Sequence, residues 1–240
     1  IADVNVSTGK VADDAVTLAK MAPGTDGNLI TYDASGNPAA VATGSATNIL
    51  TSNGAGAAPT FQAAAAGGAW TLLEEQIVGG SVTSVDFESN IDSTYEHYVF
   101  VVTGYTHLGE GNQSWLRVGT GGTPTYQTSA YDYHSSKCLV TSTSYSASAA
   151  TNAASIVYGE NIAVASTDEG DAVIHMFNPA NTAYFTKFVF QGTAGTDAAQ
   201  QSNVGTGRWD TVTAVTAVRF LSESSNIDGG TFKLYGIAGA

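Results

Sequence analysis

The sequence predicts an all-β protein, with an antiparallel β-sandwich of jelly-roll type at residues 70–240 and an extended, repetitive stalk before it. Three observations predict this organisation. Large side chains from residue 70 onward occur in short runs bounded by Gly, Pro, Asn, Asp or Ser. No segment of residues 70–240 keeps a helical period over three turns. Residues 24–61 contain a repeat of about twenty residues, which is typical of stacked structural units.

The repeat is an echo within residues 24–61: GNLITYDASGNPAAV is followed twenty residues later by TNILTSNGAGAAPTF. Each copy has a short apolar run, a turn and a second short run, which predicts strand, turn, strand. Gly36 and Gly56 permit positive φ in the turns, and Asp33 and Asn53 can bond their own backbone. A chance echo in a composition rich in Gly, Ala and Thr is the alternative. Because an isolated hairpin is marginal in water, we expect this segment to need copies of itself.

The segments on either side of the repeat are less informative. Residues 1–23 contain VSTGKVA and, ten residues later, VTLAKMA, which fit either a short helix or part of a fibre repeat. Pro23 ends either structure. Residues 62–69, QAAAAGGA, carry no large side chain and are expected to form a linker or a tightly packed neck. Since the chain starts with Ile1 and not Met, we expect it to be the C-terminal part of a longer polypeptide.

About eight strands are expected in the head, residues 70–240. Tyr98–Val102 is apolar on both faces, which predicts a central strand. Residues 212–221 alternate between two faces, as a half-buried strand does. The expected strands lie within 70–78, 95–105, 114–119, 154–164, 171–177, 184–190, 213–222 and 231–237.

Composition and charge exclude several classes of protein. The net charge of −13 repels phosphate backbones, so we expect no nucleic-acid partner. No run of eighteen apolar residues is present, so we expect no membrane insertion. The single Cys138 excludes an intrachain disulfide and a multi-cysteine zinc site, and is expected to be a buried small apolar residue.

No catalytic residue, cofactor site or metal site is predicted, and we expect a protein that is not an enzyme. None of the histidines lies in a nucleophile elbow or beside a recognisable partner. The acidic residues of STDEGDAV could hold Ca²⁺ through oxygen ligands, but no known calcium-loop spacing is present and a solvated loop is the favoured interpretation. The histidines are His97, His107, His134 and His175, and the acidic residues are Asp168, Glu169 and Asp171.

The segment YQTSAYDYHSS supplies the candidate receptor-binding residues: Tyr126, Tyr131, Tyr133 and His134. Tyrosines on a polar, adaptable loop can stack on sugar rings and hydrogen-bond their hydroxyls. The alternative is core packing, because Tyr131 and Tyr133 share strand parity and would point to the same side of a strand.

Two parts of the chain resemble tail-fibre-like proteins of tailed bacteriophages. Residues 6–62 are similar to the repetitive shafts of such fibres, and SNIDSTYEHYVFVV with GGTFKLYGI resembles the β-rich domain that follows them. The resemblance implies a virion structural protein, a homotrimer, that joins other virion proteins through its N-terminal side and contacts a host surface glycan or protein through its head. Trimerisation would also cover strand edges that a single chain leaves open.

Two other functions are compatible with the same resemblance. One is a fibre that decorates the capsid or another part of the virion, with a structural role and no dedicated receptor. The other, less favoured, is a polysaccharide depolymerase, for which two carboxylates would have to flank a groove. Plentiful acidic residues do not by themselves indicate such a pair.

Overall fold

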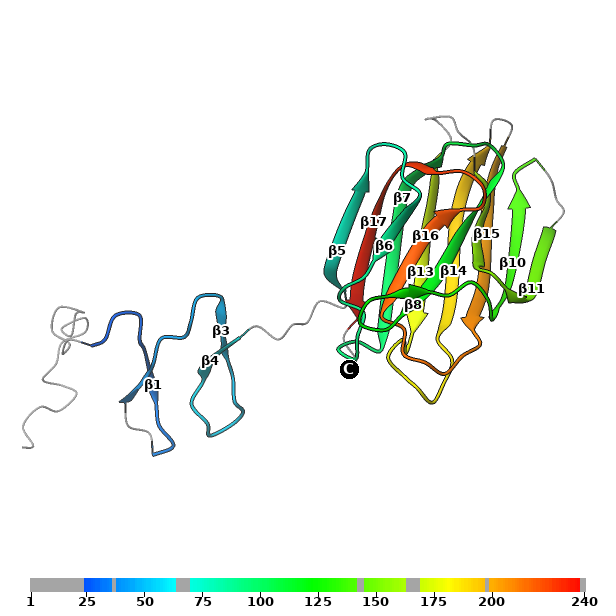
Figure 1. Ribbon diagram of the computed structural model, residues 1–240. Helices are drawn as coiled ribbons and strands as arrows, with labels where there is room; N and C mark the ends of the chain where they lie inside the picture. The colour runs from blue at the N-terminus through cyan, green and yellow to red at the C-terminus, as the bar shows by residue number, and fades with distance from the viewer. Residues whose placement is uncertain are drawn as a thin grey trace, which may run out of the picture. The chain divides into compact units, whose positions relative to one another are not determined.

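The computed structural model describes residues 24–35, 38–63, 70–141, 145–162, 169–196 and 199–237, and within these residues all secondary structure is β (Figure 1). The chain divides into two compact units, Ile1–Gly67 and Gly68–Ala240. The prediction of an all-β, antiparallel protein is confirmed for the described residues. The segment 1–23 and most of the expected neck, 64–69, lie outside them. No helix of the described part has the length and apolarity needed to cross a membrane.

The first unit contains two antiparallel hairpins that match the two copies of the sequence repeat. Strand β1 (Leu29–Tyr32) pairs with β2 (Pro38–Val41), and β3 (Asn48–Thr51) pairs with β4 (Thr60–Ala63). The strand, turn, strand prediction is therefore confirmed for each copy. Strand β4 continues to Ala63, two residues into the segment expected to be the neck.

The same tight turn precedes each hairpin. Gly27 has φ 78° and Thr47, twenty residues later, has φ 73°. The next residue donates its backbone N–H three residues back in both copies: from Asn28 to the Thr25 carbonyl at 3.2 Å, and from Asn48 to the Ser45 carbonyl at 3.1 Å. The repetition in sequence is thus also a repetition of backbone conformation.

Replacing Thr47 by Gly is expected to stabilise the second hairpin by about 1 kcal/mol. A β-branched residue is strained at positive φ, and the first copy already has glycine at this position. Amide hydrogen exchange of β3 and β4 should slow in the variant. A matched change of Thr51, which has no positive φ, to Gly should instead accelerate exchange, and faster exchange in Thr47→Gly would contradict the strain argument.

The loops of the hairpins are closed by polar side chains. The Ser35 N–H donates to Asp33 Oδ1 at 2.8 Å, and Asn53 Nδ2 donates to the Ala58 carbonyl at 2.8 Å. Gly56 has φ 79°, as the turn prediction requires, whereas Gly36 lies outside the described residues. The expected side-chain bonding of Asp33 and Asn53 to the local backbone is confirmed.

A single copy of the hairpins leaves apolar side chains in solvent. Val41 is buried, but the apolar residues of β1 and β3 are 42–67% exposed. Such exposure is costly for an isolated chain, because each large apolar side chain gains roughly 1.5–3 kcal/mol when it is fully buried. The exposed residues are Leu29, Ile30, Tyr32, Ile49 and Leu50.

The described residues of the second unit, the head, form two antiparallel sheets, which overlap in the view of Figure 1. The eight-stranded sheet has the order β11 (Tyr145–Ala153), β10 (Tyr131–Leu139), β15 (Ala199–Trp209), β14 (Lys187–Thr196), β13 (Gly170–Phe177), β7 (His97–His107), β17 (Ile227–Ile237) and β5 (Thr71–Val78). The five-stranded sheet has the order β12 (Ile156–Ile162), β8 (Asn112–Thr120), β16 (Ala217–Ser222) and β6 (Ser84–Phe87), with β9 (Thr125–Tyr126) paired to β8.

One hydrophobic core joins the two sheets of the head. The ring of Phe220 from β16 lies near the centre of an aromatic cluster, with ring centroids 5.2–6.1 Å from four other rings of both sheets. Rings at these separations gain both burial and favourable edge-to-face contacts. The four partners are Phe87, Phe100, Tyr158 and Phe232.

Two predictions about individual strands have different outcomes. Tyr98–Val102 lies on β7, an interior strand between β13 and β17, so the prediction of a central strand is confirmed. The expected strand at 213–222 is shorter, because β16 begins at Ala217. Ala217 and Val218 are both fully buried, so the expected alternation does not hold there.

Candidate functional site

The face of the eight-stranded sheet directed away from the core carries its side chains in rows set by strand register. Alternate residues of β14, such as Phe188 and Phe190, belong to the core, so Lys187 and Val189 point outward. One row across five strands consists of Asp132, Arg208, Lys187, Phe177 and His97. The next row along the strands contains His134, Thr206, Val189 and His175.

Three adjoining hollows follow these rows, and we call them together the trough. The largest, about 680 Å³, has side chains of both rows in its lining. The second, about 410 Å³, shares His134, Val189 and Thr206 with it. The third, about 360 Å³, shares Gln191 and Val204 with the second. From Lys187 to Thr193 on β14 the trough extends for about 20 Å at the usual rise per residue.

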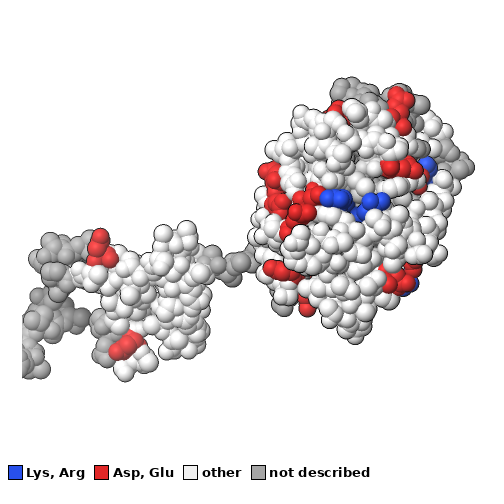
Figure 2. Space-filling view, in the orientation of Figure 1, with Lys and Arg blue, Asp and Glu red and all other residues white. Residues whose placement is uncertain are grey.

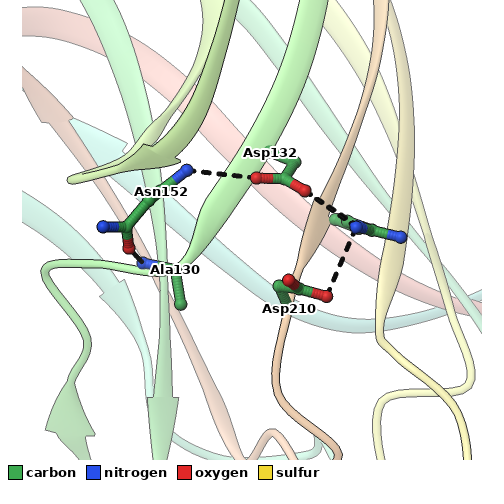
Figure 3. Close-up of polar contacts among 5 residues, drawn as sticks. Ala130, Asp132, Asn152 and Asp210 are labelled. Atoms are coloured by element: carbon green, nitrogen blue, oxygen red, sulfur yellow. Dashed lines mark hydrogen bonds and ion pairs between the residues drawn. The ribbon is translucent and has the colours of Figure 1, made fainter.

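A network of polar contacts fixes one end of the trough (Figure 3). Asp132 Oδ1 accepts the Asn152 N–H at 3.1 Å, and Asn152 Oδ1 accepts the Ala130 N–H at 3.1 Å. Arg208 Nη2 lies 2.8 Å from Asp132 Oδ2 and 3.4 Å from Asp210 Oδ1. The Asn152 N–H and the Arg208 guanidinium together hold the pKa of Asp132 below its ordinary value. Asp132 is therefore ionised at neutral pH, and Arg208 is held in place.

The backbone around this network is irregular. The register between β10 and β11 shifts between Tyr131 and Tyr133, because Asp132 of β10 faces two residues of β11, Thr151 and Asn152, in a β-bulge. Ala130 and Asn152, the two residues bridged to each other, have φ of 67° and 51°. Alanine at positive φ is strained by about 1–2 kcal/mol. Backbone strain of this kind clusters at ligand-binding and active sites.

Lys187 and Arg208 form a cross-strand pair of like charges on this face. Directly opposite residues of one face have Cβ atoms about 5 Å apart, so the two cations repel each other. Arg208 is paired with two carboxylates, those of Asp132 and Asp210. In the part of the head that the structure describes, Lys187 is the one lysine or arginine with neither an ion pair nor a side-chain hydrogen bond. Figure 2 shows that charged residues are sparse over most of the view.

Aromatic and histidine rings continue the first two rows toward β17. His97 Nε2 lies 2.9 Å from His175 Nδ1, and the Phe177 ring stacks on His97 with centroids 4.5 Å apart. Trp70 meets His175 edge-on at 6.3 Å and is 43% exposed. Burial lowers the pKa of both histidines, and the neighbouring His175 lowers that of His97 further. Both rings are therefore neutral at pH 7 and share one hydrogen bond, as expected for sheet histidines.

Two of the four residues predicted for receptor binding lie away from the trough. Tyr126 belongs to β9 of the other sheet, where its hydroxyl donates to Glu88 at 3.0 Å and Arg219 lies 3.7 Å above its ring. Tyr131 is fully buried; its hydroxyl accepts the Val118 N–H at 2.8 Å, and burial raises its pKa. A buried ring cannot contact a receptor, so the interpretation of Tyr131 as a binding residue is corrected to core packing.

The other two predicted residues, Tyr133 and His134, lie on β10 beside the trough and point to opposite faces of that strand. Tyr133 is half-buried and packs against the core, as the parity alternative anticipates, and it is also among the residues that line the largest hollow. His134 is exposed and lines the first two hollows. The sequence does not predict the trough residues Asp132, Lys187 and Arg208. Charged residues make up only 12% of the chain. Each charged residue inside a β-rich segment is therefore unusual, and this is the signal that could have identified the three.

The candidate metal and histidine sites of the sequence lie as follows in the described residues. They contain no cluster of three or more His, Cys, Asp or Glu side chains able to hold a metal ion. Of the acidic loop, Asp168 lies outside the described residues, and Asp171 Oδ1 accepts the Gly104 N–H at 3.0 Å. His107 contacts Ser114 and Ser222, but all three are buried in the head. Cys138, expected to be buried, is half-buried on β10.

Comparisons with protein-family models, with curated proteins and with solved structures found no match for this chain.

Proposed function

We propose that this chain is a structural fibre or spike protein of a tailed bacteriophage virion, which attaches the particle to a host cell surface through its head. In this proposal the protein is a homotrimer, the hairpins of the first unit form the stalk, and the head is a jelly-roll-like sandwich. The N-terminal side joins other virion proteins. The proposal rests on the fibre resemblance of the sequence together with the trough on the head.

The observation that carries the attachment role is the trough on the outer face of the eight-stranded sheet. It is open, about 20 Å long, and lined by valines and aromatic rings beside hydroxyl, amide and charged side chains. Extended sites of mixed apolar and polar lining suit a polymer better than a small substrate.

The exposed apolar residues of the hairpins support the trimeric stalk. Leu29, Ile30 and Ile49 would be buried if three chains placed their hairpins against one another. A closed threefold arrangement would also end the assembly at a fixed size. Sedimentation velocity of the whole chain should then give the mass of a trimer, and a folded monomer at micromolar concentration would contradict this part of the proposal.

Replacing Val189 by Glu is expected to abolish binding of the labelled chain to bacterial cells. Val189 is 44% exposed and lines the first two hollows, so a longer charged side chain there blocks the trough. Val212→Glu is the matched control, because Val212 is 47% exposed and lines none of the three hollows. Flow cytometry measures binding of both variants, and unchanged binding by Val189→Glu would contradict attachment through this face.

A further inference from the structure

We propose that the trough takes an acidic polysaccharide with isolated carboxylates, and that Lys187 and Arg208 bind one carboxylate at its basic end. This inference rests on the proposed attachment function, because it names the class of ligand for the same site. Its physical basis is a cationic pair that the fold places together without neutralising both members.

The first step concerns charge. Lys187 and Arg208 are direct neighbours across β14 and β15, and like charges in that position destabilise a sheet. Arg208 turns its Nε and Nη2 toward Asp132, which leaves the exposed Lys187 without an anion among the described residues. A ligand carboxylate beside Lys187 gives this lysine the anionic partner that it lacks among the described residues, and hydrogen bonds to charged donors are the stronger kind.

The second step concerns how rigidly the pair is held. Arg208 is fixed by Asp132 and Asp210 and stacks over the Phe185 ring at 5.1 Å. Asp132 is in turn fixed by the Asn152 backbone at the bulge. A positioned guanidinium loses less freedom when it binds than a free one does. Its side chain is still 43% exposed, so a ligand can reach it.

The third step explains why the trough favours a polysaccharide with isolated carboxylates over a densely charged polyanion. The whole chain carries a net charge of −13, which repels a polymer with a charge on every unit, such as a nucleic acid. Beyond the cationic pair the trough is lined by uncharged Thr206, Gln191 and Thr193, which can hydrogen-bond sugar hydroxyls. The third hollow is also lined by the carboxylate of Asp171, which repels a further negative charge at that end. One carboxylate followed by neutral sugars therefore matches the order of side chains along the trough.

The test measures binding of the whole chain to oligosaccharides of hyaluronan and gellan, in which neutral sugars separate the carboxylates, by isothermal titration calorimetry. Each is compared with its carboxyl-reduced counterpart, and inorganic phosphate serves as the simple-anion probe. We expect at least one acidic oligosaccharide to bind about tenfold or more tightly than its reduced form. Phosphate alone should bind far more weakly, because it fills none of the trough beyond the cationic pair.

Lys187→Met should lower the affinity for that oligosaccharide by about tenfold, and Lys187→Arg should restore most of it. Lys233→Met is the matched control, because Lys233 belongs to β17 of the same sheet, lines none of the three hollows and is already paired with Glu75. Equal affinity for acidic and reduced sugars, or an unchanged affinity in Lys187→Met, would overturn the inference. Cell binding that is lost in Val189→Glu but unaffected in Lys187→Met would leave the attachment function standing and refute only the acidic ligand.

Discussion

Phe220→Ala is expected to lower the free energy of unfolding of the head by about 4 kcal/mol. Phe220 is fully buried on β16 and its ring contacts aromatic residues of both sheets. Truncation removes buried apolar surface and leaves a cavity between two sheets that cannot close over it, because the backbone of each is held by ladder hydrogen bonds.

Denaturant unfolding followed by tryptophan fluorescence measures this loss for the head alone. All three tryptophans of the chain, Trp70, Trp115 and Trp209, belong to the head. Tyr184→Ala serves as the control, since Tyr184 is 69% exposed and its removal should change stability by no more than about 0.5 kcal/mol. Similar losses in the two variants would show that the ring of Phe220 does not join the sheets as described.

The sequence predicts those strands and hairpins whose hydrophobic pattern is contained within one short segment. The hairpins follow from an apolar run, a turn and a second run repeated at one spacing. Strand β7 follows from an uninterrupted run of large apolar residues, which is typical of a strand in the interior of a sheet. These features could be predicted because buried strands are enriched in β-branched and aromatic residues, and this enrichment is visible in each segment by itself.

Other strands of the eight-stranded sheet lack such a run of large apolar residues. Strand β11 reads YSASAATNA and β15 reads AQQSNVGTGRW, with small or polar residues at most positions. They are strands because their backbones pair with β10 and β14, and glycines such as Gly205 allow the Phe190 ring to lie against β15. Pairing between distant segments does not depend on the local hydrophobic pattern, so it could not be read from that pattern.

The trough could not be predicted for the same reason. Asp132, Lys187 and Arg208 come from three strands and meet only through the register of the sheet. His134 can be identified because it lies in a conspicuous aromatic segment, whereas the prediction for Tyr131 is wrong because aromatic richness does not say which face of a strand is buried. Parity within β10 separates His134 from Tyr131, but the direction of the core depends on the other sheet.

The head is expected to lose stability in mild acid through His107. Burial lowers the pKa of His107 from 6.5 to about 4, and the ring lies between Ser114 and Ser222 at 3.3 Å from each hydroxyl. The folded state therefore holds the ring neutral, whereas the unfolded chain takes up a proton once the pH falls below 6.5. Since the unfolded state binds more protons, stability falls with decreasing pH between about 6.5 and 4.

The expected loss attributable to His107 is about 3 kcal/mol between pH 7 and pH 4. His97 and His175 contribute with the same sign, because their pKa values are also lowered, so the wild-type slope alone does not isolate His107. The comparison with His107→Gln does, because glutamine keeps a polar group between the two serines but does not titrate. Urea unfolding at several pH values should give a stability difference between wild type and variant that changes by about 3 kcal/mol across this window. A stability difference that stays constant with pH would mean that the His107 ring is already protonated or hydrated in the folded head. That result would contradict the description of His107 as buried and neutral.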